Sequence, residues 1–178
     1  MSIEKQQRVK AFKQIDDRKR TVIGEMLARK MLSEYCHISE QQIFFKIGEH
    51  GKPYAVNCAE FNISHSKNMV VCAISDNSVG IDVEKIRPIG INILHKLCTD
   101  RDLEYMFGNM VSFNDLPACF SNKELKRFYE LWSAKEAYFK CVGTGLKNLK
   151  SISMDKLMRN KKTYQIKDYI ITVIESQK

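Results

Sequence analysis

One long segment between Ser121 and Gly143 constrains the fold more than any other part of the chain. Ser121 and Glu124 match a capping box, and Gly143 stands where a glycine that ends a helix belongs. Residues 122–142 are therefore predicted to form one helix. Its apolar residues recur at helical spacing and make a single stripe, which is typical of a helix that packs against a core. The stripe consists of Leu125, Phe128, Trp132, Phe139 and Val142.

The remaining helices and strands do not alternate regularly. A second helix is predicted at 17–36, where Asp16 or Asp17 can cap its start, and a short helix begins near Thr99 and Asp102. Strands are predicted at 42–47, 69–74, 79–86, 151–154, 164–166 and 169–174. The segment 61–66 is short and mixed, and 108–119 reads as an irregular loop. Because no regular βαβ alternation occurs, the predicted fold class is α+β.

The charge of the chain is uneven. It carries 29 Lys and Arg residues against 21 Asp and Glu residues, a net charge of +8. The excess lies in residues 1–30, with nine basic and four acidic residues, and in residues 122–162, with eleven and four. These segments are either solvated helix faces or surfaces that meet an anion, such as nucleic acid, a phosphorylated small molecule or an acidic protein. A basic nucleic-acid-binding module is therefore one alternative function.

Several classes of protein are not expected. No apolar run approaches the ~20 residues of a membrane-spanning helix, and the polar first residues do not form the core of a signal peptide. The cysteines include no CxxC pair, which argues against a zinc cluster. They are Cys36, Cys58, Cys72, Cys98, Cys119 and Cys141. We expect all of them to be reduced, and the protein to be cytoplasmic and free of membrane.

Two acidic residues share one face of a predicted strand. Asp82 and Glu84 are two positions apart, so their Cα atoms lie ~7 Å apart and their side chains point the same way. They are either solvated or converge on an oxygen-liking cation such as Mg²⁺. Glu136 interrupts the apolar stripe of helix 122–142, with Lys140 one turn later. A buried carboxylate needs a cation or a donor, which a Glu136–Lys140 pair could supply. If the three acids meet, however, they require a divalent metal.

Ser64 and His65 add polar groups between apolar positions. They could hold a phosphate or act in acid–base chemistry, and His65 could equally be a structural histidine. Neighbouring residues of a strand face apart, so a hydrolytic Ser–His pair is not predicted.

Four blocks of sequence resemble a known family in their order and spacing. They are GKP at 51–53, FNISHS at 61–66, GIDVEK at 80–85 and WSAKEAYFK at 132–140. Together they resemble the signature of 4′-phosphopantetheinyl transferases of the large, surfactin-synthetase-activating (Sfp-like) type. The resemblance implies two similar α+β halves related by a pseudo-twofold axis, which we place at residues 1–78 and 79–178.

The resemblance also implies an activity. Members of this family move the phosphopantetheine arm of coenzyme A onto a serine of an apo carrier protein and release 3′,5′-ADP. We therefore expect a monomeric, Mg²⁺-dependent enzyme that acts on acidic acyl or peptidyl carriers of fatty-acid, polyketide or nonribosomal peptide synthesis. It would need neither nucleic acid nor membrane. A coenzyme-A-binding relative without transferase activity is the closer alternative.

By the same resemblance, Asp82, Glu84 and Glu136 would bind Mg²⁺. Glu136 would also take the proton from the carrier serine, directly or through a metal-bound water. Lys140 would neutralise the phosphate during transfer.

The remaining implied contacts are with coenzyme A. Ser64 and His65 would hold the pyrophosphate or the 3′-phosphate, and Lys52 would lie near the adenine and the 3′-phosphate. The other expected coenzyme contacts are Lys5, Arg8, Arg20 and Thr21.

Overall fold

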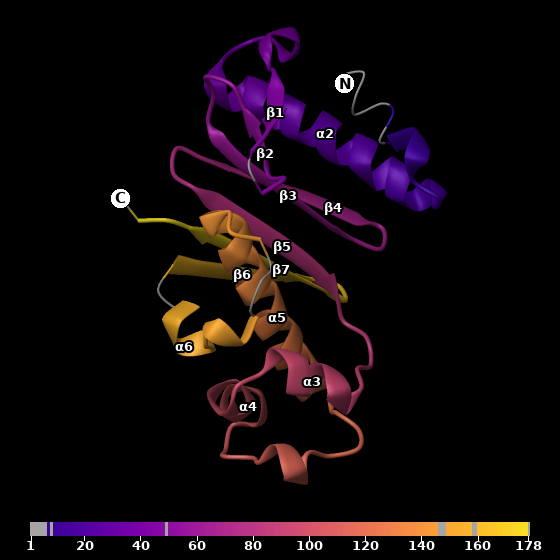
Figure 1. Cartoon of the computed structure of the whole chain (residues 1–178), viewed down its shortest axis with the longest axis vertical. Coiled ribbons are helices and arrows are strands. Elements are labelled where there is room, and N and C mark those ends of the chain that lie inside the picture. The colour runs from indigo at the N-terminus through magenta and orange to yellow at the C-terminus, as the bar shows by residue number, and fades with distance from the viewer. Residues whose placement is uncertain (1–6, 8, 49, 146–148, 158–159, 178) are drawn as a thin grey trace.

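The computed structural model describes residue 7 and residues 9–48, 50–145, 149–157 and 160–177. Figure 1 shows helix α2 (Ile15–Cys36) and the hairpin of β1 (Phe45–Ile47) and β2 (Pro53–Ala55) at one end of the molecule. The opposite end holds helices α3 (Ile91–Leu97) and α4 (Asp100–Phe107). The longest strands lie between the two ends.

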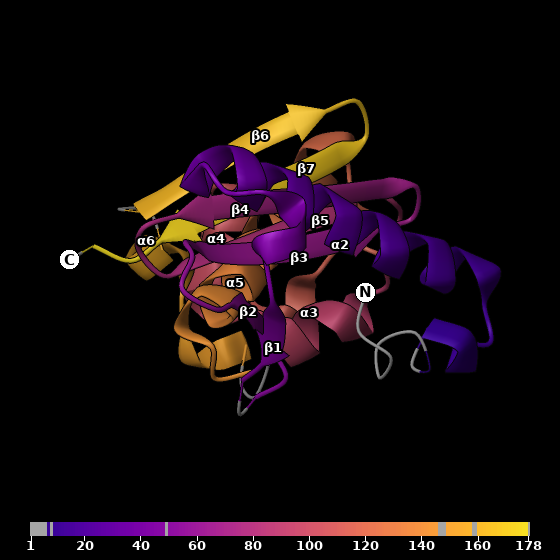
Figure 2. The ribbon, with the colours of Figure 1, turned by 90° about the horizontal axis from the view of Figure 1, so that it is seen from above.

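The first layers of the fold are α2 and an antiparallel hairpin. The hairpin consists of β3 (Glu60–Ser66) and β4 (Met69–Ser75), and α2 lies across it (Figure 2). Ala28 and Leu32 on α2 have no exposed surface and pack in one core cluster with Phe61 of β3. These apolar contacts fix the helix on the outer face of the hairpin.

A disulfide closes the chain around the β1–β2 hairpin. Cys36 at the end of α2 is bonded to Cys58, and their Cα atoms are 6.3 Å apart. The expectation that all six cysteines are reduced is therefore wrong for this pair. The fold brings together two thiols that are 22 positions apart in sequence. Cys72, Cys98, Cys119 and Cys141 are free.

The second sheet has the order β5-β7-β6, and all its neighbours are antiparallel. Its strands are β5 (Val79–Lys85), β6 (Lys161–Ile166) and β7 (Tyr169–Glu175). Helix α5 (Asn122–Val142) packs on β5 and β7. The expected capping box of Ser121 and Glu124 is present, and Gly143 ends α5 in the left-handed conformation with φ 77°.

The two sheets also pack on each other. Met69, Val71 and Ala73 of β4 contact a core cluster that includes Ile81 and Val83 of β5. The molecule is therefore layered as α2, β3–β4, β5–β7–β6 and α5. The α+β fold class is confirmed. The pseudo-twofold relation and the division at residues 78 and 79 stay predictions.

A buried ion pair organises the end of the molecule opposite α2. Lys135 Nζ of α5 lies 2.6 Å from Asp102 Oδ2 of α4, and the two side chains are 1% and 0% exposed. Asp102 also accepts hydrogen bonds from Thr99 and from the backbone of Met154. These hydrogen bonds and the ion pair offset the cost of burying the polar groups of Asp102 and Lys135.

Some local predictions differ from the structure. Residues 151–154 are not a strand. They join the short helices η3 (Leu149–Ser151) and α6 (Met154–Leu157), and the backbone N–H of Met154 donates a hydrogen bond to the buried Asp102. Neither Asp16 nor Asp17 caps α2, because Gln14 occupies the N-cap position and makes no side-chain cap. Strand β2 and helix α3 were not predicted. Two further turns are η1 (Glu40–Gln42) and η2 (Phe113–Asp115).

None of the helices in the described ranges is both long and apolar enough to cross a membrane.

Candidate functional site

Helix α5 reaches the site because β5 contains a glycine where the two elements meet. A Cβ atom at Gly80 would lie 1.9 Å from the backbone oxygen of Ala137 and 2.4 Å from the backbone nitrogen of Cys141. Only a residue without a side chain fits this approach. Gly80, Asp82 and Glu84 share a strand face, so both acids point toward α5. Farther along, Ser133 Oγ of α5 lies 2.7 Å from Thr172 Oγ1 of β7.

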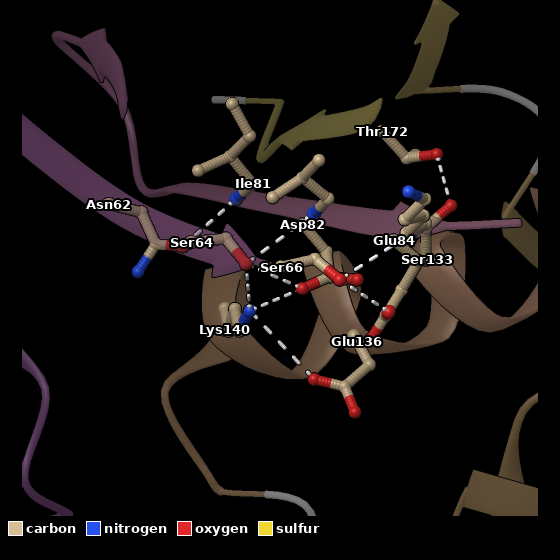
Figure 3. A network of polar contacts seen from close by, with 12 residues as sticks. Asn62, Ser64, Ser66, Ile81, Asp82, Glu84, Ser133, Glu136, Lys140 and Thr172 are labelled. Atoms are coloured by element: carbon tan, nitrogen blue, oxygen red, sulfur yellow. Dashed lines mark hydrogen bonds and ion pairs between the residues drawn. The ribbon is translucent and has the colours of Figure 1, made fainter. Parts of the chain in front are cut away.

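The ammonium group of Lys140 lies among polar side chains from three elements (Figure 3). Its Nζ is 2.6 Å from Asp82 Oδ1 of β5 and 3.8 Å from Glu136 Oε2 of α5. It also donates to Ser64 Oγ of β3 at 3.0 Å. Ser64 in turn donates to Asp82 Oδ1 at 2.8 Å. The structure thus brings together four residues that the sequence analysis had singled out separately.

The three acids are difficult to ionise together. Burial raises the pKa of Glu136 to about 7, and the charges of Asp82 and Glu84 add to the rise. Burial also raises the pKa of Asp82, although Lys140 and Ser64 partly offset it. The pKa of Glu84 is raised by burial and by Asp82. Each carboxylate therefore disfavours the ionisation of its neighbours unless positive charge is added.

The donor set can be compared with the needs of a metal ion. Among the described residues, no three His, Cys, Asp or Glu side chains are placed so that they could hold a metal ion together. Lys140 supplies the positive charge between Asp82 and Glu136 instead. The chemistry nevertheless fits a hard divalent cation: all three groups are carboxylates, and the buried Asp82 Oδ2 has no hydrogen-bond partner within the described part of the chain.

A large cavity lies beside this network. It has a volume of about 1340 Å³ and is lined by parts of α2, the β1–β2 hairpin and β3, including Arg20, Thr21 and His65. The guanidinium of Arg20 donates to the backbone oxygen of Lys67 at 2.9 Å, and Thr21 Oγ1 donates to that of Asp17 at 2.8 Å. Desolvation and then the charge of Arg20 lower the pKa of His65, which favours its neutral ring at pH 7.

The other expected coenzyme contacts lie elsewhere or are not described. Lys52 Nζ donates to the backbone oxygen of Val79 at 3.1 Å and is 4.0 Å from Glu60 Oε2. It is not among the residues that line the cavity. Lys5 and Arg8 lie outside the described residues.

Strand β3 separates the cavity from the acidic network. His65 lines the cavity, whereas Ser64 is buried and bonded to Asp82 and Lys140. This follows from the alternation of side chains along a strand. Asn62 and Ser66, for which no role was predicted, also contact β5. Their spacing with Ser64, at every second position, was the signal that could have shown that the three side chains share a face.

Two family models match the chain one after the other. The model described as 4′-phosphopantetheinyl transferase, N-terminal, matches residues 1–77. The model described as the 4′-phosphopantetheinyl transferase superfamily matches residues 78–174, more than half of the chain.

Curated relatives agree with the family models. The 4′-phosphopantetheinyl transferase gsp of Aneurinibacillus migulanus is 38% identical over 146 residues, which cover 82% of this chain and 57% of that protein. The 4′-phosphopantetheinyl transferase Sfp of Bacillus subtilis (strain 168) is 34% identical over 148 residues, which cover 82% and 62%. An L-aminoadipate-semialdehyde dehydrogenase-phosphopantetheinyl transferase of Xenopus laevis is 29% identical over 154 residues, covering 80% and 49%. The chain thus spans about half to three-fifths of the length of these relatives.

Proposed function

The chain belongs to the 4′-phosphopantetheinyl transferase superfamily, and from this we propose that it is a transferase that uses coenzyme A. It would move the phosphopantetheine arm to a serine hydroxyl of an apo carrier protein and release 3′,5′-ADP. The observation that carries the proposal is the meeting of Asp82, Glu136 and Lys140 on one side of strand β3, with the cavity lined by His65 on its other side. The site thus combines acids, a cation and room for a ligand.

Glu136 is the proposed base for the carrier serine. In the metal-free protein its pKa is about 7, so the carboxylate and the carboxylic acid are both populated near neutral pH. A base with this property can accept a proton in the reaction and release it afterwards. In the structure, its Oε2 atom is 3.8 Å from Lys140 Nζ, so the positive charge of Lys140 stabilises the ionised form.

Lys140 and the cavity residues are the proposed partners of the phosphates. Transfer of a phosphoryl-type group depends mainly on positioning and on neutralisation of negative charge. Lys140 would supply such charge at the pyrophosphate. Arg20, Thr21 and His65 would bind coenzyme A from the cavity. We further propose Ser64, Lys52, Lys5 and Arg8 as coenzyme contacts on the basis of the family resemblance.

Asp82, Glu84 and Glu136 are the proposed ligands of Mg²⁺. When bound, this ion would neutralise pyrophosphate oxygens and orient the leaving group. The raised pKa values of all three carboxyl groups and the unpartnered Asp82 Oδ2 support the assignment. The chain's own contribution is to keep the carboxylates together against mutual repulsion.

The setting of the reaction is also part of the proposal. We propose a monomer whose basic surface, including part of residues 122–162, meets an acidic acyl or peptidyl carrier. We also propose a cytoplasmic location on the basis of the four free cysteines, and there the Cys36–Cys58 pair would be kept reduced as well. Carriers of fatty-acid, polyketide or nonribosomal peptide synthesis have the required serine. We propose no nucleic-acid partner, since the acidic network would repel phosphates unless a cation were bound.

The decisive experiment is to incubate the protein with coenzyme A, Mg²⁺ and several apo carriers, and to measure carrier masses. We expect one phosphopantetheinyl group to be added to at least one carrier. Glu136→Gln should abolish detectable transfer, with a loss of rate of about 10²- to 10⁴-fold, the usual effect of losing a general base. Asp82→Asn should also abolish detectable transfer.

The matched control is Glu130→Gln. Glu130 lies on the same helix, but its carboxylate accepts a hydrogen bond from Tyr105 and is not part of the network of Asp82, Glu84 and Glu136. It should transfer at nearly the normal rate. Absence of a mass gain on every carrier would contradict the transferase proposal. Tight binding of coenzyme A without transfer would instead favour a binding protein that has lost the reaction.

A further inference from the structure

On the edge of β5 that faces β3, backbone N–H groups donate hydrogen bonds to side chains of β3 and not to its backbone carbonyls. Asn62 Oδ1 accepts from the backbone N–H of Ile81 at 2.9 Å. Ser64 Oγ accepts from Val83 at 3.4 Å, and Ser66 Oγ from Lys85 at 3.3 Å. All three bonds join residues 19 positions apart, so β3 and β5 run in the same direction at a constant register. We call these three contacts the side-chain ladder.

The two serines of the ladder also hold the acids of β5. Ser64 Oγ donates to Asp82 Oδ1 at 2.8 Å, and Ser66 Oγ donates to Glu84 Oε2 at 3.1 Å (Figure 3). Each hydroxyl therefore accepts from one backbone amide of β5 and donates to the carboxylate of the residue before it. A hydroxyl is suited to this arrangement because it both donates and accepts, whereas a carboxylate can only accept.

Ser66 and Ser64 differ in their other contacts. Ser64 is bonded to Lys140 as well, and is itself a proposed coenzyme contact. The hydroxyl of Ser66 contacts Glu84 and the amide of Lys85. Glu84 is half-buried, and the hydrogen bond from Ser66 at 3.1 Å fixes the position of its carboxylate against the backbone of β5.

We propose that Ser66 is a positioning residue: its hydroxyl holds the carboxylate of Glu84 within the acidic network, where Glu84 is a proposed metal ligand. This inference rests on the proposed function for its catalytic consequence, but not for its structural content. Removal of a residue that hydrogen-bonds to a metal ligand commonly lowers metal affinity or activity by about 10- to 100-fold.

The chain contains a matched control. Ser75 of β4 also donates to a carboxylate of the second sheet, that of Glu175 at the end of β7. The contact has the same chemistry and spans the same two sheets, but it lies away from the acidic network. Ser75→Ala therefore reports the effect of losing a serine–carboxylate bond between the sheets without touching Glu84.

The first measurement is amide hydrogen exchange in the metal-free protein. Ser66→Ala should accelerate exchange at Lys85 by about fivefold, as expected for loss of one ordinary hydrogen bond. Ser66→Thr, which keeps the hydroxyl, should remain close to the wild type. Ser75→Ala should leave Lys85 unchanged. Unaltered exchange at Lys85 in Ser66→Ala would overturn the ladder contact.

The second measurement uses Mn²⁺ as a spectroscopic probe of the metal site. Ser66→Ala should weaken Mn²⁺ binding by about tenfold or more, with recovery in Ser66→Thr and no effect of Ser75→Ala. In a Glu84→Gln background, Ser66→Ala should change affinity less than twofold, because Ser66 would act through Glu84. Equal effects in both backgrounds, or a wild type that binds no Mn²⁺, would overturn the positioning role.

The third measurement separates this inference from the proposed function. If the wild type transfers phosphopantetheine, Ser66→Ala should lower kcat more than it raises KM for coenzyme A, because Ser66 makes no proposed coenzyme contact. If the wild type transfers to no carrier while exchange and Mn²⁺ binding respond as expected, the proposed function fails and the positioning of Glu84 stands.

Discussion

The buried carboxyl group of Glu136 affects both the stability of the fold and the proposed proton transfer. Its side chain is only 14% exposed, on a helix face that is otherwise apolar, and it faces Lys140 at 3.8 Å. Burial raises its pKa from 4.5 to about 7. An acid with a pKa near neutral is useful for proton transfer. The same shift means that its ionised form destabilises the fold.

This shift predicts how stability depends on pH. Between pH 4.5 and about 7, folded protein retains a proton on Glu136 that the unfolded chain has released. The free energy of unfolding should therefore fall as pH rises through this window, by at most about 3 kcal/mol from this group. Glu136→Gln should remove that part of the fall. Urea unfolding of metal-free protein at pH 5 and pH 7.5 measures it.

The control for this prediction is Glu34→Gln, a change of a carboxylate that is 68% exposed on α2. It should leave the pH dependence close to that of the wild type. If Glu136→Gln shows the same fall as the wild type, the carboxyl of Glu136 does not titrate in this range.

Elements were predictable where their boundaries depend on local contacts. The capping boxes at Thr99 and Ser121 mark the starts of α4 and α5, and both are present. Residues 151–154 were wrongly predicted as a strand, because their alternating pattern does not reveal the buried Asp102 that binds the backbone of Met154. The short helix α3 lacks a side-chain cap, so its start carries no such signal.

The packing of α5 on β5 predicts a large effect at Gly80. Gly80→Ala would place a methyl group 1.9 Å from the backbone oxygen of Ala137, and neither backbone can move without shifting its whole element. We expect a loss of about 3 kcal/mol or more in the free energy of unfolding, toward the upper end of overpacking effects. Chemical denaturation followed by far-UV circular dichroism measures it.

Gly90→Ala is the comparison, because nothing lies within 4 Å of a Cβ atom at that glycine. It should change stability by less than about 1 kcal/mol, because Gly90 is the exposed N-cap of α3 and the change only replaces one cap residue by a poorer one. Similar stability of the two variants would mean that α5 and β5 do not approach as closely as the structure has them.

At the scale of the whole molecule, two sets of layers share buried surface: α2 with the β3–β4 hairpin, and α5 with the β5–β7–β6 sheet. We call these two sets of layers the halves of the molecule. Val71 of β4 packs with Ile81 and Val83 of β5, and the side-chain ladder joins β3 to β5 beside them. Neither sheet can separate without exposing apolar surface and unpaired amides. We infer that the halves are coupled in stability even though each has its own helix and core.

This coupling predicts a single unfolding transition. Leu32 is fully buried in α2, and Leu32→Ala should cost about 2–5 kcal/mol. The fluorescence of Trp132, the chain's single tryptophan, reports on α5 in the other half. We expect its unfolding midpoint to fall together with that of far-UV circular dichroism.

Met26→Ala, which changes a residue of α2 that is 64% exposed, should leave both midpoints in place. A Trp132 transition that keeps its wild-type midpoint in Leu32→Ala would show that the halves unfold independently.

The sequence by itself determined the features that depend on neighbouring residues: the bounds of α5, the shared face of Asp82 and Glu84, and the motif blocks that indicate the family. Tertiary structure alone decided the Cys36–Cys58 bond, the contact of Ser66 with Glu84 and the contact of Ser64 with Asp82. Caps and strand alternation are fixed by contacts within a few positions. The other contacts join residues about twenty positions apart, and their partners are chosen only when the packed layers bring them together.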